Sequence, residues 1–324
     1  MKKDDFQYEY FSSVNQREVE WLWYPYIPYG KITILQGDPG EGKSTFMLNI
    51  AALLTQGKAM PDGYPILKPQ KVVYQTAEDN IADTVKPRLI AAGADCNKVS
   101  YIVDDNSPLT FEDPRLERII NETEARLLIL DPLQAYLSQD SDMLSAGRMR
   151  QQLRKVADIA EKTKCAVVII GHMNKSRGNK NLYRGLGSID ITAIARSVLM
   201  ITRDHVDIYR RYMFPVKTSL APEGLPIAFQ LKPEQGIEWL GTTEVNMNEQ
   251  MNYSVDKNKL ALAERILTET LEKQDVLSKD IMAKMKLMGV SERTVNKAKT
   301  TLGITSYRKN GVWYWHLEDE SIGE

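Results

Sequence analysis

Residues 32–45, ITILQGDPGEGKST, decide the fold of this chain. The first four residues are apolar or β-branched, as in a short buried strand, and a glycine soon ends the run. Residues 37–44 match the pattern G-x-x-x-x-G-K-[ST], and an apolar run with helical character follows over residues 46–54. Strand, glycine loop and helix in this order are the context that a phosphate-binding loop requires.

Each part of this loop has a role in holding phosphate groups. The glycines let backbone N–H groups converge on phosphate oxygens, and the amino end of the helix adds a positive dipole. The Lys43 ammonium can reach the β- and γ-phosphates, and the Ser44 hydroxyl can bind Mg²⁺. We therefore expect a nucleotide and Mg²⁺ at one continuous run of residues: Gly37, Asp38, Pro39, Gly40, Glu41, Gly42, Lys43, Ser44 and Thr45.

Composition places the chain among ordinary globular proteins. It has 324 residues, of which 43% are hydrophobic and 26% charged, and its net charge is −1. A polyanion would therefore have to bind a local basic patch. Cys96 and Cys165 have no partners at metal-ligand spacing, which predicts neither a disulfide framework nor a zinc site and favours a cytoplasmic protein. No apolar run approaches the length that spans a bilayer, so we expect no membrane partner.

Two carboxylates follow apolar strands. Glu78 comes after the strand expected at residues 71–76, and Asp131 ends the one expected at residues 125–131. Ligands of open α/β sheets bind at the carboxyl ends of the strands. Glu78 is thus our candidate for activating the attacking water, the alternative being an acidic turn or a helix cap with Asp79. Asp131 is expected beside the Mg²⁺ bound to Ser44.

A further buried strand, residues 165–171, leads to His172 and a basic segment. His172 stands where a γ-phosphate sensor would lie, although a satisfied core histidine is the alternative. The segment after it contains four basic residues and no acid: Lys175, Arg177, Lys180 and Arg184. This pattern favours contact with single-stranded nucleic acid over a merely solvated loop.

The rest of the sequence predicts an N-terminal arm, the bounds of the core domain, a linker and a C-terminal domain. Residues 1–20 are expected to form an arm that docks a partner. The aromatic stretch 21–30 is expected to pack against the core rather than stack on a nucleobase. An ATPase domain would then cover residues 21–243 and a linker residues 244–255. Residues 256–324 predict three helices and a hairpin, the outline of a winged helix that contacts DNA or docks a protein.

Particular phrases after the histidine strand resemble a known family. They are GHMNK at residues 171–175, YRGLGSID at 183–190 and ARS at 195–197. With the glycine loop, they resemble the RecA-like ATPases, most closely the RepA-type hexameric helicases and related phage or plasmid ATPases. The resemblance covers roughly residues 21–240. It implies an α/β fold with a mostly parallel sheet flanked by helices, ATP as the nucleotide, and a ring of identical subunits, expected to be a hexamer.

The same resemblance implies roles for single residues. Glu78 would polarise water, Asp131 would serve the Mg²⁺, and His172 would sense phosphate or DNA. Arg196 would enter the neighbouring subunit's site as an arginine finger, with Arg203 as the second choice, and residues 175–184 would face a central channel.

The implied function is an ATP-driven motor, most closely a helicase of phage, plasmid or mobile-element replication or recombination. The alternative is an ATP-dependent switch that loads another replication or recombination protein through the arm or the C-terminal domain. A nucleotide kinase is disfavoured, because no acceptor site or lid signature accompanies the loop.

Overall fold

The computed structural model describes residues 8–103, 108–137, 146–172, 193–204, 207–232, 236–247, 250, 255–272, 274–309 and 311–317. It separates into two compact units, Met1–Glu244 and Val245–Glu324, which are described one at a time. Within these ranges, no helix is long and apolar enough to cross a membrane.

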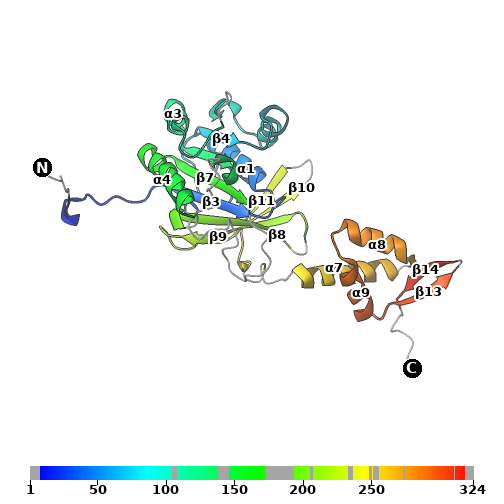
Figure 1. Cartoon of the computed structure of the whole chain (residues 1–324). Helices are drawn as coiled ribbons and strands as arrows, with labels where there is room; N and C mark the ends of the chain where they lie inside the picture. The colour runs from blue at the N-terminus through cyan, green and yellow to red at the C-terminus, as the bar shows by residue number, and fades with distance from the viewer. Residues whose placement is uncertain are drawn as a thin grey trace. The chain divides into compact units, whose positions relative to one another are not determined.

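A mixed sheet organises the first unit. Its order over the described residues is β11-β10-β9-β8-β3-β7-β6-β4-β5 (Figure 1). Six strands run parallel: β3 (Ile32–Gly37), β4 (Val72–Thr76), β5 (Val99–Ser100), β6 (Leu127–Asp131), β7 (Ala166–His172) and β8 (Ser197–Arg203). Three antiparallel strands extend it: β9 (Arg210–Thr218), β10 (Ile227–Lys232) and β11 (Gly236–Thr242). The α/β prediction is confirmed, but β11 was not predicted.

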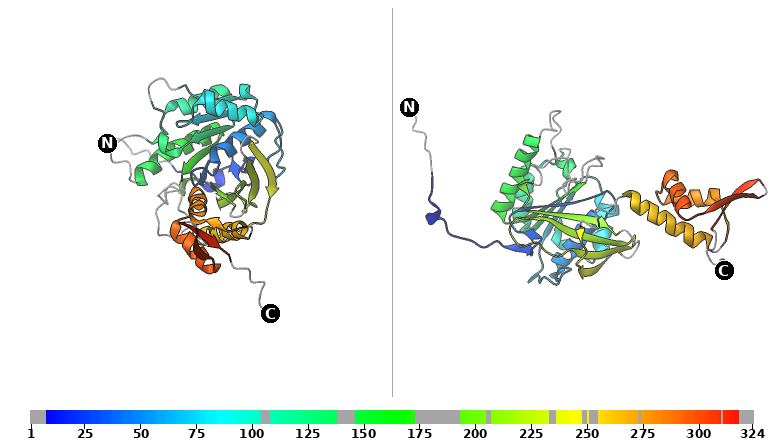
Figure 2. Two further views of the ribbon diagram at one scale, coloured as in Figure 1. Left: turned by 90° about the vertical axis from the view of Figure 1, so that its right-hand side faces the viewer. Right: turned by 90° about the horizontal axis from the view of Figure 1, so that it is seen from below.

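Helices cover both faces of this sheet, as Figures 1 and 2 show. Alternate strand residues point to opposite faces. Leu35 and Ile129 therefore pack in one apolar cluster with α1 (Lys43–Gln56) and α2 (Lys86–Ala91). Ile34 and Leu128 pack in another cluster with α3 (Pro114–Thr123) and α4 (Ala146–Thr163). The result is three layers, and ligands of such folds bind at the carboxyl ends of the parallel strands.

The aromatic stretch forms a short hairpin, β1 (Trp21–Trp23) and β2 (Ile27–Pro28), that packs into the core. Trp23 is fully buried, and its Nε1 donates to Asp62 Oδ1 at 2.9 Å. The Tyr26 hydroxyl donates to Leu225 O at 2.6 Å. The packing interpretation of this stretch is therefore confirmed. The described part of the arm, residues 8–20, is exposed, and Phe11, in the short 3₁₀ turn Phe11–Ser13, is 96% exposed.

The second unit contains the predicted helices and hairpin. They are α7 (Val255–Leu271), α8 (Ser278–Leu287), α9 (Glu292–Thr301), β13 (Thr305–Lys309) and β14 (Val312–His316). Ser291 caps α9 as expected, accepting from Thr294 N at 3.3 Å. A strand that was not predicted, β12 (Val276–Leu277), pairs with β14. Asn310 lies outside the described residues, and the winged-helix interpretation stays a prediction.

Candidate active site

The loop between β3 and α1 needs glycine for steric reasons. A Cβ at Gly37 would lie 2.5 Å from the backbone oxygen of Ile201 in β8. A Cβ at Gly42 would lie 2.7 Å from Leu231 Cδ2 in β10, and Gly42 has a φ of +87°. The loop is thus pressed against the neighbouring strands, and larger residues would displace it.

Lys43 begins α1 and is buried under the loop. Its Nζ donates to Gly37 O and to Asp38 O, both at 2.9 Å, and the residue is 4% exposed. Burial lowers the pKa of Lys43, while the nearby carboxylates, Asp131 first among them, raise it. Since a buried cation held by carbonyl oxygens is poorly compensated, a triphosphate is a fitting partner.

Ser44 and Asp131 meet at a third side chain, Tyr74. The Tyr74 hydroxyl donates to Asp131 Oδ2 at 2.8 Å, and Ser44 is close enough to lower the pKa of this hydroxyl. Burial first, and then the Asp131 carboxylate, raises the pKa of Tyr74 well above its usual value. Both predicted Mg²⁺ residues therefore lie near one hydroxyl oxygen. Tyr74 was not predicted, because nothing in its apolar strand distinguishes it until the register of β4 and β6 brings it next to Asp131.

These residues suit Mg²⁺. The ion prefers oxygen ligands and keeps several waters, so one hydroxyl and one carboxylate with phosphate oxygens are sufficient. Over the described ranges, no group of three or more His, Cys, Asp or Glu side chains could hold a metal without such help. Ser44 and Asp131 would hold the ion, which would supply positive charge against the phosphates.

Glu78 and Asp79 follow β4 and have different surroundings. Asp79 Oδ2 accepts from Arg88 at 2.9 Å. Asn80 caps the short π-helical segment Ile81–Val85 that leads into α2, and its Oδ1 accepts from Ala82 N at 2.8 Å, so the alternative that Asp79 is the cap was wrong. Glu78 is exposed, and its charge acts on Lys43. The role of Glu78 in activating the attacking water stays a prediction.

Of the histidine and the basic segment, the structure describes the backbone of His172. β7 ends at His172, which pairs in register with Gly37, so its backbone lies beside the loop. The His172 side chain is outside the described residues, and so are the four residues predicted to contact nucleic acid: Lys175, Arg177, Lys180 and Arg184. Their roles stay predictions.

Arg196 lies at the opposite edge of the sheet from the loop. It is exposed and precedes β8, where its N donates to Ile32 O at 3.0 Å at the start of β3. Five residue steps separate Arg196 from Ile201 beside Gly37, or about 17 Å at about 3.3 Å per residue. Lys217 is its neighbour, with Nζ donating to Ala195 O at 2.9 Å. Burial lowers the pKa of Lys217, and the Arg196 charge lowers it further. These two cations cannot serve the loop of their own chain.

Arg203, by contrast, is bound to its own loop. Its Nη2 donates to Gly40 O at 3.2 Å, and its Nε lies 3.8 Å from Glu41 Oε2. Burial raises the pKa of Glu41, and the charges of Arg203 and then Arg211 oppose the rise. Arg203 is thus occupied within its own chain, which counts against it as the second choice for an arginine finger.

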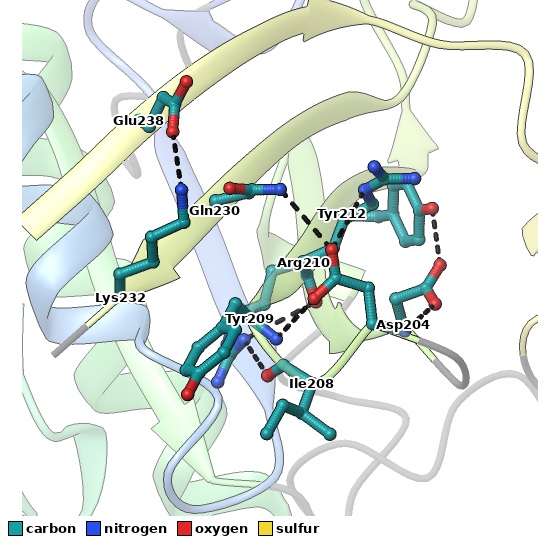
Figure 3. A network of polar contacts seen from close by, with 10 residues as sticks. Asp204, Ile208, Tyr209, Arg210, Tyr212, Gln230, Lys232 and Glu238 are labelled. Atoms are coloured by element: carbon teal, nitrogen blue, oxygen red, sulfur yellow. Dashed lines mark hydrogen bonds and ion pairs between the residues drawn. The ribbon is translucent and has the colours of Figure 1, made fainter.

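A polar network braces the turn after Arg203 (Figure 3). Tyr212 donates to Asp204 Oδ2 at 2.6 Å. Asp207 Oδ2 accepts from Gln230 at 3.4 Å and lies 3.9 Å from Arg210 Nε. Because these contacts join β8, β9 and β10, they fix the strands that contact the glycine loop.

Comparisons with known proteins agree with this geometry. The family described as AAA domain matches residues 5–178. A DNA repair protein RadA from Halalkalibacterium halodurans is 26% identical over 148 residues, covering 45% of this chain and 28% of that protein. RadA from Chlamydia pneumoniae is 28% identical over 154 residues, covering 45% and 29%. The chain therefore aligns with less than a third of the length of these relatives.

A solved structure is also similar, that of a KaiC-like protein from Pyrococcus horikoshii OT3. Its TM-score is 0.48 at 17% identity, covering 65% of this chain and 90% of that one. The family match spans more than half of this chain and includes the glycine loop, Glu78 and Asp131. The chain belongs to the AAA domain family and is a RecA-like P-loop ATPase.

Proposed function

We propose that this protein is an ATP-hydrolysing, DNA-associated ring motor, most closely a helicase of the RepA type that acts in replication or recombination. The observation that carries the proposal is the separation of two sets of charges. The phosphate-binding loop and the Ser44–Tyr74–Asp131 contact lie at the carboxyl edge of the parallel strands. Arg196 and Lys217 lie at the amino edge. A site that needs both must be assembled from two subunits.

Each residue then has one task in hydrolysis. The loop backbone and Lys43 would hold the phosphates, and Ser44 and Asp131 would hold Mg²⁺, which would supply charge against the phosphates. Glu78 orients the attacking water and accepts its proton. Arg196 of the neighbouring subunit stabilises the charge that develops on the transferred group, a contribution of about 10³ to 10⁵ in rate for arginine fingers.

DNA is the proposed partner for two reasons. The segment 175–184 is basic in a chain of net charge −1, so it provides the local patch that a polyanion requires. The RadA relatives are named as DNA repair proteins. A hexameric ring would place one such segment from each subunit around a central channel, and the arm or the second unit would bind a replication or recombination partner.

The rate of ATP hydrolysis, measured against protein concentration with and without single-stranded DNA, tests this proposal. A shared site predicts that the rate per subunit rises with concentration and with DNA, and that Lys43→Ala stays inactive under all conditions. A rate per subunit that is independent of dilution would contradict it. Strand displacement on a forked duplex separates the motor from the alternative, a loader or switch that hydrolyses ATP without unwinding.

Salt dependence tests where DNA binds. Neutralising three basic side chains that contact single-stranded phosphates should reduce the slope of log K against log salt by about 2, at about 0.7 per contact. We expect this for Lys175→Ala/Arg177→Ala/Lys180→Ala. The matched variant in α9 is Arg293→Ala/Lys297→Ala/Lys299→Ala. An unchanged slope in the first variant and a reduced slope in the second would move the DNA site to the second unit.

A further inference from the structure

A cavity of about 280 Å³ begins where the phosphate-binding loop ends. Thr45, Asn49 and Leu53, spaced four residues apart, line it from one face of α1. Ile237 and Trp239 of β11 close another side. β11 and α2 both contact α1, as can be followed in Figure 1. Arg88, Ala91 and Ala92, from α2 and its end, and Gly236 of β11 complete the lining.

We infer that this cavity receives the base of the nucleotide and that Trp239 is the surface on which the base lies. The inference rests on the proposed function, because it concerns the same nucleotide. Thr45 directly follows Ser44, so a nucleotide with its phosphates on the loop must place its sugar and base within a short distance of Thr45. The cavity is the hollow that starts at that residue.

The lining has the chemistry that a nucleobase requires. Base sites are largely apolar, with a few polar groups that fix orientation. Trp239, Ile237 and Leu53 supply the apolar surface. Asn49 supplies an amide, and its Nδ2 donates to Thr45 O at 2.9 Å. That bond holds the side chain in place and does not use its oxygen acceptor.

Trp239 is held in position before any ligand arrives. Its ring lies 5.3 Å from the Phe46 ring, edge on, and 5.8 Å from the Phe229 ring, between centroids. The residue is only half-buried, so part of the ring stays available to a ligand. An aromatic ring that is fixed in advance binds a planar base at low entropic cost.

A larger cavity of the first unit does not compete for this role. It measures about 590 Å³ and is lined by Trp21, Tyr29, Lys71 and Arg126 among others. Lys71 and Arg126 precede β4 and β6, so this cavity lies at the amino edge of the sheet. A base bound there would be separated from the phosphate loop by the length of the strands.

Binding of ATP and of inorganic tripolyphosphate, which lacks a base, tests the inference by calorimetry with Mg²⁺. Since stacking on an aromatic ring contributes about tenfold or more to affinity, Trp239→Ala should weaken ATP binding by about that factor. Tripolyphosphate binding should not change. Trp239→Phe should restore most of the ATP affinity. The matched control is Trp313→Ala, which removes a tryptophan of the second unit that is 53% exposed and should leave the ATP affinity unchanged.

A second variant guards against misfolding at the packed tryptophan. Ala91→Phe changes an exposed residue on the rim, and its ring should fill the cavity and weaken ATP but not tripolyphosphate. ATP affinities of both variants within twofold of the wild type would overturn the inference, and so would an equal loss for both ligands. Failure of the wild-type protein to bind either ligand would instead overturn the proposed function, and the base site with it.

Discussion

Mixing two inactive variants tests whether each active site is shared between neighbouring subunits. Lys43→Ala removes the ammonium that holds the phosphates, and Arg196→Ala removes the proposed arginine finger. Arg196→Ala alone should keep ATP binding and lose about 10³ to 10⁵ in turnover. If the site is shared, a subunit of one variant can supply what its neighbour lacks.

The size of the recovery follows from the arrangement. A working interface needs intact Lys43 on one side and intact Arg196 on the other. Within one chain, about 17 Å along β8 separates Arg196 from Ile201, which lies beside Gly37 of the loop. In a random equal mixture, half of the subunits have intact Lys43 and the other half have intact Arg196. The mixture should therefore recover about a quarter of the wild-type rate, if head-to-tail contacts form at random. A cis-acting Arg196 predicts no recovery.

The assay is phosphate release after the two variants are dissociated by dilution and reassembled together. A double variant, Lys43→Ala/Arg196→Ala, is the control partner, because it can assemble but completes no site with either single variant. Size-exclusion chromatography verifies that mixed species form. The shared site would be refuted if the mixed assemblies were no more active than the two variants measured separately. Full turnover by Arg196→Ala alone would refute it as well.

Further predictions concern the buried groups. Tyr74→Phe removes the donor to the Asp131 carboxylate, so the free energy of unfolding in denaturant titrations should fall by about 1.5–3 kcal/mol, and hydrolysis should require more Mg²⁺; unchanged values would contradict the contact. Burial lowers the pKa of Lys43 below 10.5, and phosphate binding needs the protonated form of its side chain. The affinity for ATP should therefore fall as the pH rises through that lowered pKa, whereas the Lys43→Arg variant should show no such fall. Burial raises the pKa of Cys165 to about 12, so a thiol reagent at pH 8 should modify half-buried Cys96 first and Cys165 only after unfolding.

The sequence predicted those features that depend on short-range pattern. The glycine loop, the strand that ends at Asp131 and the helix capped by Ser291 each have a local signature that long-range packing does not override. The position of Glu78 after β4 also followed from strand order alone. Such features are set by backbone geometry within a few residues.

Contacts between distant segments were not predictable in the same way. Tyr74 reads as one more buried residue of an apolar strand until register brings it next to Asp131. Arg203 reads as a strand-end charge, and only folding places it on Gly40, far away in sequence. β11 was missed because residues 233–242 mix polar, glycine and apolar residues without clear alternation. Trp239, and with it the cavity beside Thr45, was missed for the same reason.

The separation of the two edges also limits how subunits can assemble. The phosphate loop and Arg196 lie at opposite ends of the parallel strands. A contact between the loop of one subunit and Arg196 of the next therefore pairs two different surface patches. Such heterologous contacts repeat from subunit to subunit and either close into a ring or extend as a filament. A two-fold dimer would need one patch that includes both edges, a span of about 17 Å along the strands. With ATP and Mg²⁺ we therefore expect light scattering to show species larger than a dimer, and electron microscopy to show rings. A stable dimer that hydrolyses ATP at the full rate would contradict this arrangement, even if the mixing experiment succeeded. The two results together would mean that both active sites are completed across one symmetric interface.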